Sequence, residues 1–144
     1  MGGFLSLSYP EAGELLGYDL LDLTDNRSFP FIRKGGKIEW ERIGPFFFIP
    51  DTLRRARSLI LEDEHSRICF VDEVGPLELK GKGIWPALAQ VQRRSTPRFL
   101  FSVRTSVLGR LLDKLENEVG EIFSQTDSQV YSNMNAHYMH CFPS

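Results

Sequence analysis

The sequence predicts an α/β fold built on a mixed, mostly parallel sheet, and three observations lead to this prediction. Short apolar runs bounded by turn residues, at 68–71 and 99–103, are typical of the buried strands of parallel sheets. Segments with helical spacing of apolar residues separate these runs and give the back half a β-α-β-α-β order. The front half is rich in aromatic and β-branched residues between turns, which favours further strands on the same sheet.

Length and composition predict one domain spanning residues 1–144. The chain is 42% apolar and 25% charged, which is ordinary for a globular protein that buries a core. A net charge of −2 gives no general attraction to nucleic acid, and no apolar run approaches the ~20 residues that span a bilayer. The two cysteines, Cys69 and Cys141, are expected to be reduced thiols. We therefore expect a cytoplasmic protein that binds neither nucleic acid nor membrane.

Strands are expected in the front half at 3–9 and 16–23, joined by a polar turn at 10–13, and at 28–32. Aromatic and β-branched residues favour extended structure at 38–40 and 46–49. A helix is expected to follow, capped by Asp51 or Thr52, because apolar residues recur at helical spacing from Leu53 to Ile60.

The back half is expected to alternate strands and helices. Strands are predicted at 67–71, 99–103 and 121–124, and helices at 84–92 and 106–116, the second with Ser106 as its cap. The tail from 127 is polar, and no element is assigned to it.

Two adjacent carboxylates, Asp72 and Glu73, follow the apolar run at 68–71 and precede a Gly-Pro break. The carboxyl ends of parallel strands are where α/β proteins bind ligands. There, Asp72 could hold a hydrated Mg²⁺, and Glu73 could orient or deprotonate an attacking water. The pattern alone fits equally well a strand that ends in a polar loop.

Arg104 follows the apolar run at 99–103. If this strand neighbours the strand at 68–71, Arg104 lies beside the two carboxylates. A guanidinium at that position could bind a γ-phosphate and stabilise charge in the transition state. An ion pair with Asp72 or Glu73, or a solvated arginine, is the other interpretation.

Two further groups of polar residues are expected to be ordinary surface features. Lys80 and Lys82 lie in a lysine-glycine loop, where solvated side chains are more common than phosphate ligands. His137 and His140 precede Cys141 at a spacing that suits a metal. A structural zinc site needs four ligands, and no second Cys/His pair is near.

The segment DEVGPLEL at 72–79 resembles the "DEIGPMEL" signature of a family of small P-loop nucleoside-triphosphatases, first described in thermophiles and known in vertebrates as the cancer-related NTPase. Residues 3–23 are similar to that family's "GFyT-E…GFdivdl" hairpin, and 43–46 to its "vGkY" strand. The resemblance keeps the family's order from Gly3 to about Val103. It implies a three-layer P-loop NTPase-like sandwich and Mg²⁺-dependent hydrolysis of nucleoside triphosphates, with Asp72 serving the metal and Glu73 the water.

The sequence departs from the family at the phosphate loop. The family has a strand and a G-x-x-G-x-G-K-T loop upstream of the "GF" strand, and the 144 residues contain no such motif. That loop supplies the N–H groups and the lysine that hold the β- and γ-phosphates. Three interpretations therefore stay open. The chain is a nucleoside-triphosphatase, a domain that binds nucleotide without turnover, or an interaction module that dimerises or pairs with another chain through a sheet edge.

Overall fold

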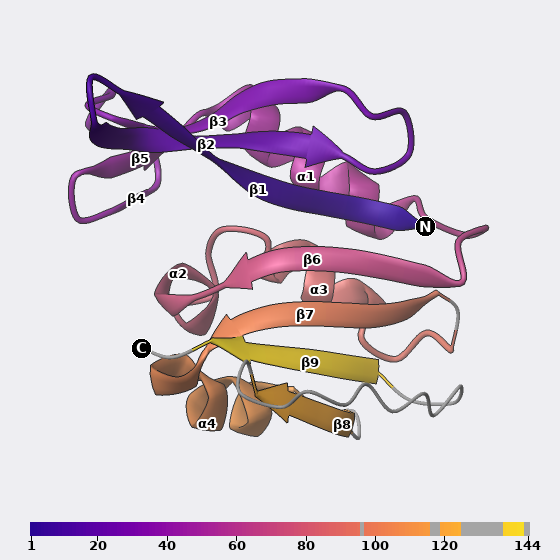
Figure 1. Ribbon diagram of the computed structural model, residues 1–144. Helices are drawn as coiled ribbons and strands as arrows, with labels where there is room; N and C mark the ends of the chain where they lie inside the picture. Colours follow the sequence, from indigo (N-terminus) through magenta and orange to yellow (C-terminus); the bar gives the residue numbers. More distant parts are fainter. Residues whose placement is uncertain (96, 116–118, 125–136, 143–144) are drawn as a thin grey trace.

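The computed structural model describes residues 1–95, 97–115, 119–124 and 137–142, which form one sheet covered by helices (Figure 1). The strands are β1 (Gly2–Glu11), β2 (Glu14–Asp22), β3 (Ser28–Lys34), β4 (Arg42–Ile43), β5 (Phe46–Phe48), β6 (Ile68–Val74), β7 (Arg98–Arg104), β8 (Val119–Ser124) and β9 (His137–Phe142). The helices are α1 (Pro50–Leu61), α2 (Pro76–Leu79), α3 (Trp85–Val91) and α4 (Thr105–Lys114).

The strand order in the described sheet is β4-β5-β3-β2-β1-β6-β7-β9-β8. The pairs β1–β6, β6–β7, β7–β9 and β9–β8 are parallel, whereas the front-half strands pair antiparallel with one another and with β1. The mixed α/β sheet that the sequence predicts is therefore confirmed, with its parallel strands gathered in one half. This half brings the carboxyl ends of β6 and β7 to the same edge.

β1 is the strand that joins the two halves, and a glycine makes the junction. Only 2–4 pair with 69–71 of β6, after which β1 diverges along β2. Gly3 has a φ of +86°, and a Cβ built on it would lie 1.9 Å from the carbonyl oxygen of Phe70. A side chain at this position would push the two strands apart, so the close approach of β1 to β6 requires glycine.

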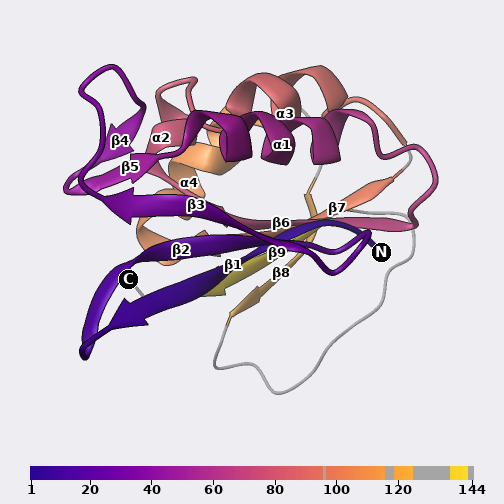
Figure 2. The same cartoon turned by 90° about the horizontal axis from the view of Figure 1, so that it is seen from above.

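The helices gather over one face of the sheet (Figure 2). α1 packs on α3 and over β1 and β3, while α4 contacts α2 and β7. The ammonium of Lys114 on α4 lies 4.5 Å from the ring centroid of Trp85 on α3, which joins α4 to the same layer. The described helices thus form one layer on the same side of the sheet, and the mixed sheet with its parallel half is consistent with the P-loop NTPase-like fold that the sequence resemblance implies.

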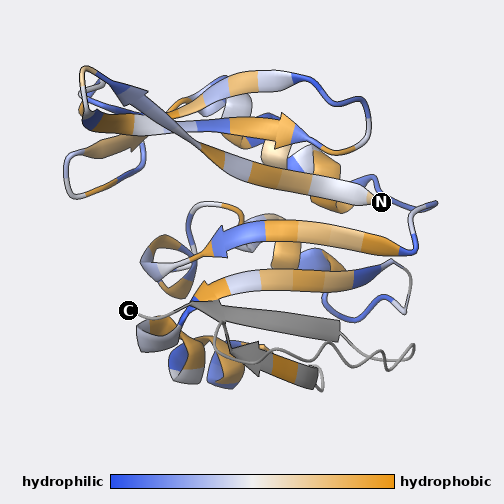
Figure 3. Ribbon diagram, in the orientation of Figure 1, coloured by the Kyte–Doolittle hydropathy of each residue, from blue (hydrophilic) through white to orange (hydrophobic). Residues whose placement is uncertain are grey.

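The core lies between this helical layer and the sheet. The hydropathy colouring shows β6 and β7 apolar along most of their length and β6 turning hydrophilic at its carboxyl end (Figure 3). Cys69, Val71, Phe99 and Phe101 face the helices and are buried, whereas Ile68, Phe70 and Leu100 on the other face are only half-buried. Full burial of a side chain of this size contributes about 1.5–3 kcal/mol. The buried stretches of β6 and β7 therefore anchor the polar residues that follow them.

Several local predictions are wrong, each for a visible reason. Residues 38–40 form a turn, closed by a 2.9 Å hydrogen bond from the Trp40 N–H to the Lys37 carbonyl, and Ile38 is 89% exposed. The first helix begins at Pro50 with no side-chain cap, because the Thr52 hydroxyl donates to the Pro30 carbonyl instead, at 2.5 Å.

The remaining differences lie in the back half. α4 begins at Thr105 with Arg104 at its N-cap, so Ser106 is not the cap. The short helix α2 occupies part of the expected loop, and β9 lies in the polar tail to which no element was assigned. The strand expected at 121–124 is confirmed as part of β8.

Candidate functional site

A bulge at the end of β6 positions the two adjacent carboxylates. The register pairs Val71 with Phe101 and Val74 with Val103, so Asp72 and Glu73 together lie opposite the single residue Ser102. Glu73 has a φ of +55°, a conformation that a residue with a side chain adopts at a cost of roughly 1–2 kcal/mol. In a regular strand the two side chains would point to opposite faces of the sheet. The bulge turns both toward one pocket.

Ser102 fixes the bulge from the neighbouring strand. Its hydroxyl donates a hydrogen bond to Oδ1 of Asp72 and accepts one from the Glu73 N–H at 2.7 Å. The Ser6 N–H of β1 donates to Oδ2 of Asp72 at 2.8 Å. Three strands therefore hold one half-buried carboxylate, and each of its oxygens keeps a lone pair that these bonds do not use.

The environment of Asp72 fits a hydrated Mg²⁺. This ion takes oxygen ligands, keeps several of its waters, and is bound through one or two carboxylates together with substrate phosphates. Asp72 offers such a carboxylate, already oriented by two donors. No cluster of three or more His, Cys, Asp or Glu side chains suited to a metal occurs in the part of the chain that the structure describes. A site that depends on a full set of protein ligands therefore does not match these residues.

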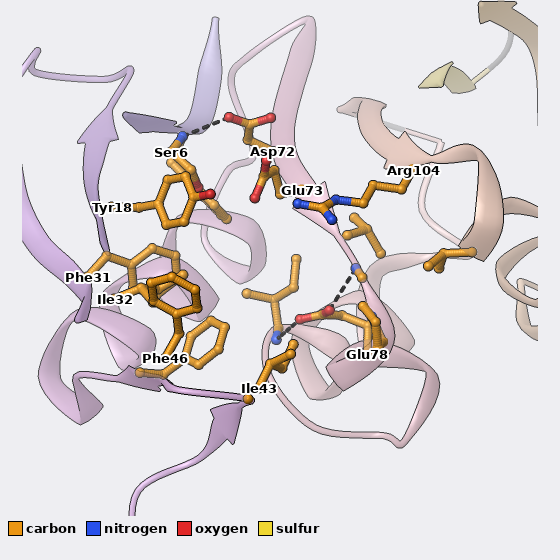
Figure 4. Close-up of a pocket in the computed structure, with 18 of the residues that line it drawn as sticks. Ser6, Tyr18, Phe31, Ile32, Ile43, Phe46, Asp72, Glu73, Glu78 and Arg104 are labelled. Atoms are coloured by element: carbon orange, nitrogen blue, oxygen red, sulfur yellow. Dashed lines mark hydrogen bonds between the residues drawn. The ribbon is translucent and has the colours of Figure 1, made fainter. Parts of the chain in front are cut away.

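Glu73 and Arg104 point into the same pocket as Tyr18, whose ring lies on the opposite wall (Figure 4). Glu73 lines the pocket and is partly exposed to solvent. The pocket walls still remove enough water to raise the pKa of its carboxyl group. The charge of Asp72 raises this pKa further, and the charge of Arg104 lowers it. Burial also raises the pKa of Tyr18, with Glu73 adding to the rise and Arg104 opposing it. No ion pair joins Arg104 to either carboxylate among the described residues. Its guanidinium therefore faces the pocket as a cation.

Glu78 closes the loop that follows the bulge. Its side chain is 5% exposed, and its two oxygens accept hydrogen bonds from the Gly75 N–H at 2.9 Å and the Ile84 N–H at 3.1 Å. Burial raises the pKa of Glu78 to about 7, although both N–H donors lower it. A Cβ on Gly83 would lie 2.1 Å from one of these oxygens. The carboxyl group thus ties both ends of the 75–84 loop beneath the pocket.

The pocket has a volume of about 410 Å³ and two unlike walls (Figure 4). Asp72, Glu73 and Arg104 form the polar wall, at the carboxyl ends of β6 and β7. The other wall comes from the front half of the chain and is mostly aromatic and aliphatic. Its members include Tyr18, Phe31, Ile32, Ile43, Phe46 and Phe48.

The structure brings together the three residues singled out in the sequence, Asp72, Glu73 and Arg104. Sequence reasoning missed Ser102 and Tyr18. A serine inside the apolar run 99–103 is a usable signal for the first, because a buried hydroxyl needs a partner. Tyr18 gives no such signal, since it lies 54 residues before Asp72 in an ordinary strand.

The other candidates do not join the site. Lys80 and Lys82 are exposed and do not line the pocket. The side chains of His137, His140 and Cys141 lie outside the described residues, so the expectation for them remains a prediction. No helix in the described ranges is long and apolar enough to cross a membrane.

Three proteins are similar in sequence to part of this chain. The nucleoside-triphosphatase THEP1 of Methanopyrus kandleri is 30% identical over 98 residues, which cover 67% of this chain and 53% of that protein. The THEP1 proteins of Pyrobaculum islandicum and Archaeoglobus fulgidus are 26% and 28% identical, over 74% and 82% of this chain and 59% and 68% of their own lengths. The chain thus spans a little over half the length of the first two. No solved structure gives a significant match.

The family comparison covers more of the chain. The model of a family described as "NTPase" matches residues 1–132, which include every strand and helix from β1 to β8 and all three site residues. This agrees with the DEVGPLEL motif, which forms the end of β6 and the helix α2 in the structure. The chain therefore belongs to this family of P-loop nucleoside-triphosphatases.

Proposed function

We propose that this chain is the part of a nucleoside-triphosphatase that handles the metal and the attacking water. The observation that carries the proposal is the bulge, which turns Asp72 and Glu73 toward one pocket at the carboxyl edge of the parallel strands. Hydrolysis of a terminal phosphate needs an oriented water and compensation of the charge on the phosphate oxygens. The polar wall of the pocket offers groups for both tasks.

In this proposal each residue has a separate role. Asp72, oriented by Ser6 and Ser102, holds Mg²⁺ through its free lone pairs. When bound, the ion neutralises charge on the phosphate oxygens. Glu73 orients the water and accepts its proton. The pKa of Glu73 is raised, which brings it closer to the near-neutral pKa that suits a general base at neutral pH. Arg104 binds the terminal phosphate from the β7 side.

The phosphate cradle is not assigned to a residue of this sequence. The 144 residues contain no G-x-x-x-x-G-K-[ST] motif, so the N–H groups and the lysine of such a loop must be supplied from elsewhere in any active assembly. A partner chain that pairs with the sheet edge is one source of that loop. Light scattering at micromolar concentration tests this part of the proposal, and a monomer that still releases phosphate would contradict it.

Phosphate release from Mg-ATP and Mg-GTP tests the catalytic role. We expect Glu73→Gln to lower turnover roughly 10²–10⁴-fold, because a general base of this kind contributes about that much. Nucleotide binding should change little, since the amide keeps the size of the side chain. Glu64→Gln, an exposed residue far from the pocket lining, is the matched control. Equal turnover by the Glu73→Gln variant and the parent chain would refute the assignment.

A further inference from the structure

The β4–β5 hairpin forms one side of the pocket and lies at the edge of the described sheet. Ile43 and Phe46 of this hairpin point into the pocket, and β4 contacts α2 in the loop that follows the bulge (Figure 4). β5 pairs with β3, whereas β4 has two residues and pairs with β5 alone among the described strands. Such a short edge strand contributes little stability, so side-chain contacts are needed to fix the hairpin over the pocket.

Glu41 connects the base of this hairpin to the 75–84 loop. Its carbonyl oxygen accepts the Phe48 N–H at 2.8 Å, which closes the hairpin. Oε1 of its side chain accepts the Gly83 N–H at 3.2 Å. Glu41 therefore belongs to the hairpin through its backbone and binds the loop through its carboxylate.

Arg57 on α1 completes this connection. Its Nε donates to the Gly83 carbonyl oxygen at 2.7 Å, and its Nη2 donates to Oε2 of Glu41 at 3.2 Å. The guanidinium presents its donors in a rigid fork and can therefore hold both acceptors at once. The side chains of Arg57 and Glu41 are 29% and 26% exposed, so solvent screens the ion pair only in part.

The loop carries this constraint to the bulge. Ile84, next to Gly83, donates its N–H to the carboxyl group of Glu78 at 3.1 Å. The same carboxyl group accepts the Gly75 N–H at 2.9 Å, directly after β6 ends. A continuous series of contacts therefore links Arg57 to the strand that carries the two adjacent carboxylates.

From these contacts we propose that Arg57 is a positioning residue for the pocket. Together with Glu41 it clamps the hairpin to the 75–84 loop, and so sets the distance between the aromatic and aliphatic wall and the polar wall. Arg57 does not line the pocket, so it acts through the residues that it holds. The consequence for turnover rests on the proposed function, whereas the clamp requires neither a metal nor a nucleotide.

Amide hydrogen exchange of the ¹⁵N-labelled chain, measured by NMR without nucleotide, tests the clamp. Arg57→Ala should speed exchange at the Gly83 and Phe48 amides, because both donate to Glu41 and are freed when the hairpin opens locally. We expect an acceleration of roughly 10-fold, the lower end for loss of a hydrogen bond to a charged group, since the pair is partly screened.

Two further variants test the geometry of the clamp. Arg57→Lys keeps the charge but loses the fork, so exchange at both amides should stay fast. Glu41→Gln keeps the size of the side chain but replaces one of its two acceptor oxygens by a donor. It should speed exchange in the same way, and it tests the clamp even if Arg57→Ala does not fold.

Arg94→Ala is the matched control. Arg94 also donates to a carbonyl oxygen, that of Leu61 at 2.7 Å, but it does not line the pocket. This variant should leave exchange at the Gly83 and Phe48 amides unchanged.

The proposal is overturned if Arg57→Ala and Glu41→Gln leave exchange at the two amides unchanged, or if Arg94→Ala speeds it equally. Full protection of both amides in Arg57→Lys would also overturn it, because the charge alone would then be sufficient.

The exchange rates do not depend on phosphate release. In an assembly that hydrolyses nucleotide, Arg57→Ala should raise KM and leave kcat nearly unchanged, whereas Glu73→Gln lowers kcat. Faster exchange in the Arg57→Ala variant of a chain that releases no phosphate would support the clamp and contradict the proposed function. Unchanged exchange in an active assembly would do the reverse.

Discussion

Ser102→Ala should destabilise the protein far more than the loss of one hydroxyl group suggests. The Ser102 side chain is fully buried, donates to the Asp72 carboxylate and accepts the Glu73 N–H at 2.7 Å. A hydrogen bond to a charged group contributes about 1.5–3 kcal/mol, and a buried N–H left without a partner costs about 1–3 kcal/mol. Water can replace part of the loss at half-buried Asp72. We therefore expect the free energy of unfolding to fall by about 3 kcal/mol.

Urea denaturation followed by circular dichroism measures this change. The m-value should stay constant while the midpoint falls by roughly 1–3 M, because m is about 1–3 kcal/mol/M for small proteins. Ser8→Ala, on an exposed part of β1, is the matched control and should change stability by less than about 0.5 kcal/mol. If Ser102→Ala and Ser8→Ala have the same effect, the serine does not hold the bulge.

A double-mutant cycle separates the two hydrogen bonds. Asp72→Ala removes the carboxylate but leaves the Glu73 N–H paired with Ser102. The coupling energy between Asp72 and Ser102 should then be about 1 kcal/mol or more, because the residues are in direct contact. A coupling energy of zero would mean that the hydrogen bond to Asp72 contributes nothing, and that the destabilisation comes from the unpaired Glu73 N–H and the cavity.

Two further predictions concern the buried carboxylates. Arg55→Ala should lower the free energy of unfolding by about 3 kcal/mol, since it leaves Asp22, whose side chain is 3% exposed, without its ion-pair partner at 2.7 Å. Arg54→Ala, which breaks a pair exposed by 67% and 87%, should change it by less than about 1 kcal/mol in the same urea assay. Burial raises the pKa of Glu78 from 4.5 to about 7, so the unfolded chain loses this proton at lower pH than the folded protein. Stability relative to Glu78→Gln should therefore be highest below pH 4.5 and fall by about 3 kcal/mol by pH 7, and a pH-independent difference between the two proteins would contradict this assignment.

The sequence predicts the elements that are set by local patterns. The apolar runs of β6 and β7 and the helical spacing of α1 are visible without a structure, because a strand packed under helices and a helix with one buried face each leave a regular pattern of apolar residues. The turn at 38–40 is different. Its aromatic and β-branched residues favour a strand, but none of the described strands pairs with Ile38, and tertiary context decides.

The site is predictable only in part, for a similar reason. The carboxylates of Asp72 and Glu73 stand at a strand end, which the sequence shows, but the left-handed conformation of Glu73 that aims them together does not follow from any local preference. The aromatic wall of the pocket needs Tyr18 and Phe46, which lie 28 residues apart on β2 and β5. Only the pairing of both strands with β3 brings them to one wall.

The place of β1 in the sheet has a consequence for the order of folding. The strands β2, β3, β4 and β5 pair with partners close in sequence, so this antiparallel part can form early as the chain emerges from the ribosome. The other edge of β1 meets residues 69–71, more than 60 positions further along the chain. Until β6 has been synthesised, this edge presents unpaired N–H and carbonyl groups. Slow translation at any point before residues 69–71 emerge from the ribosome would therefore prolong the exposure of that edge.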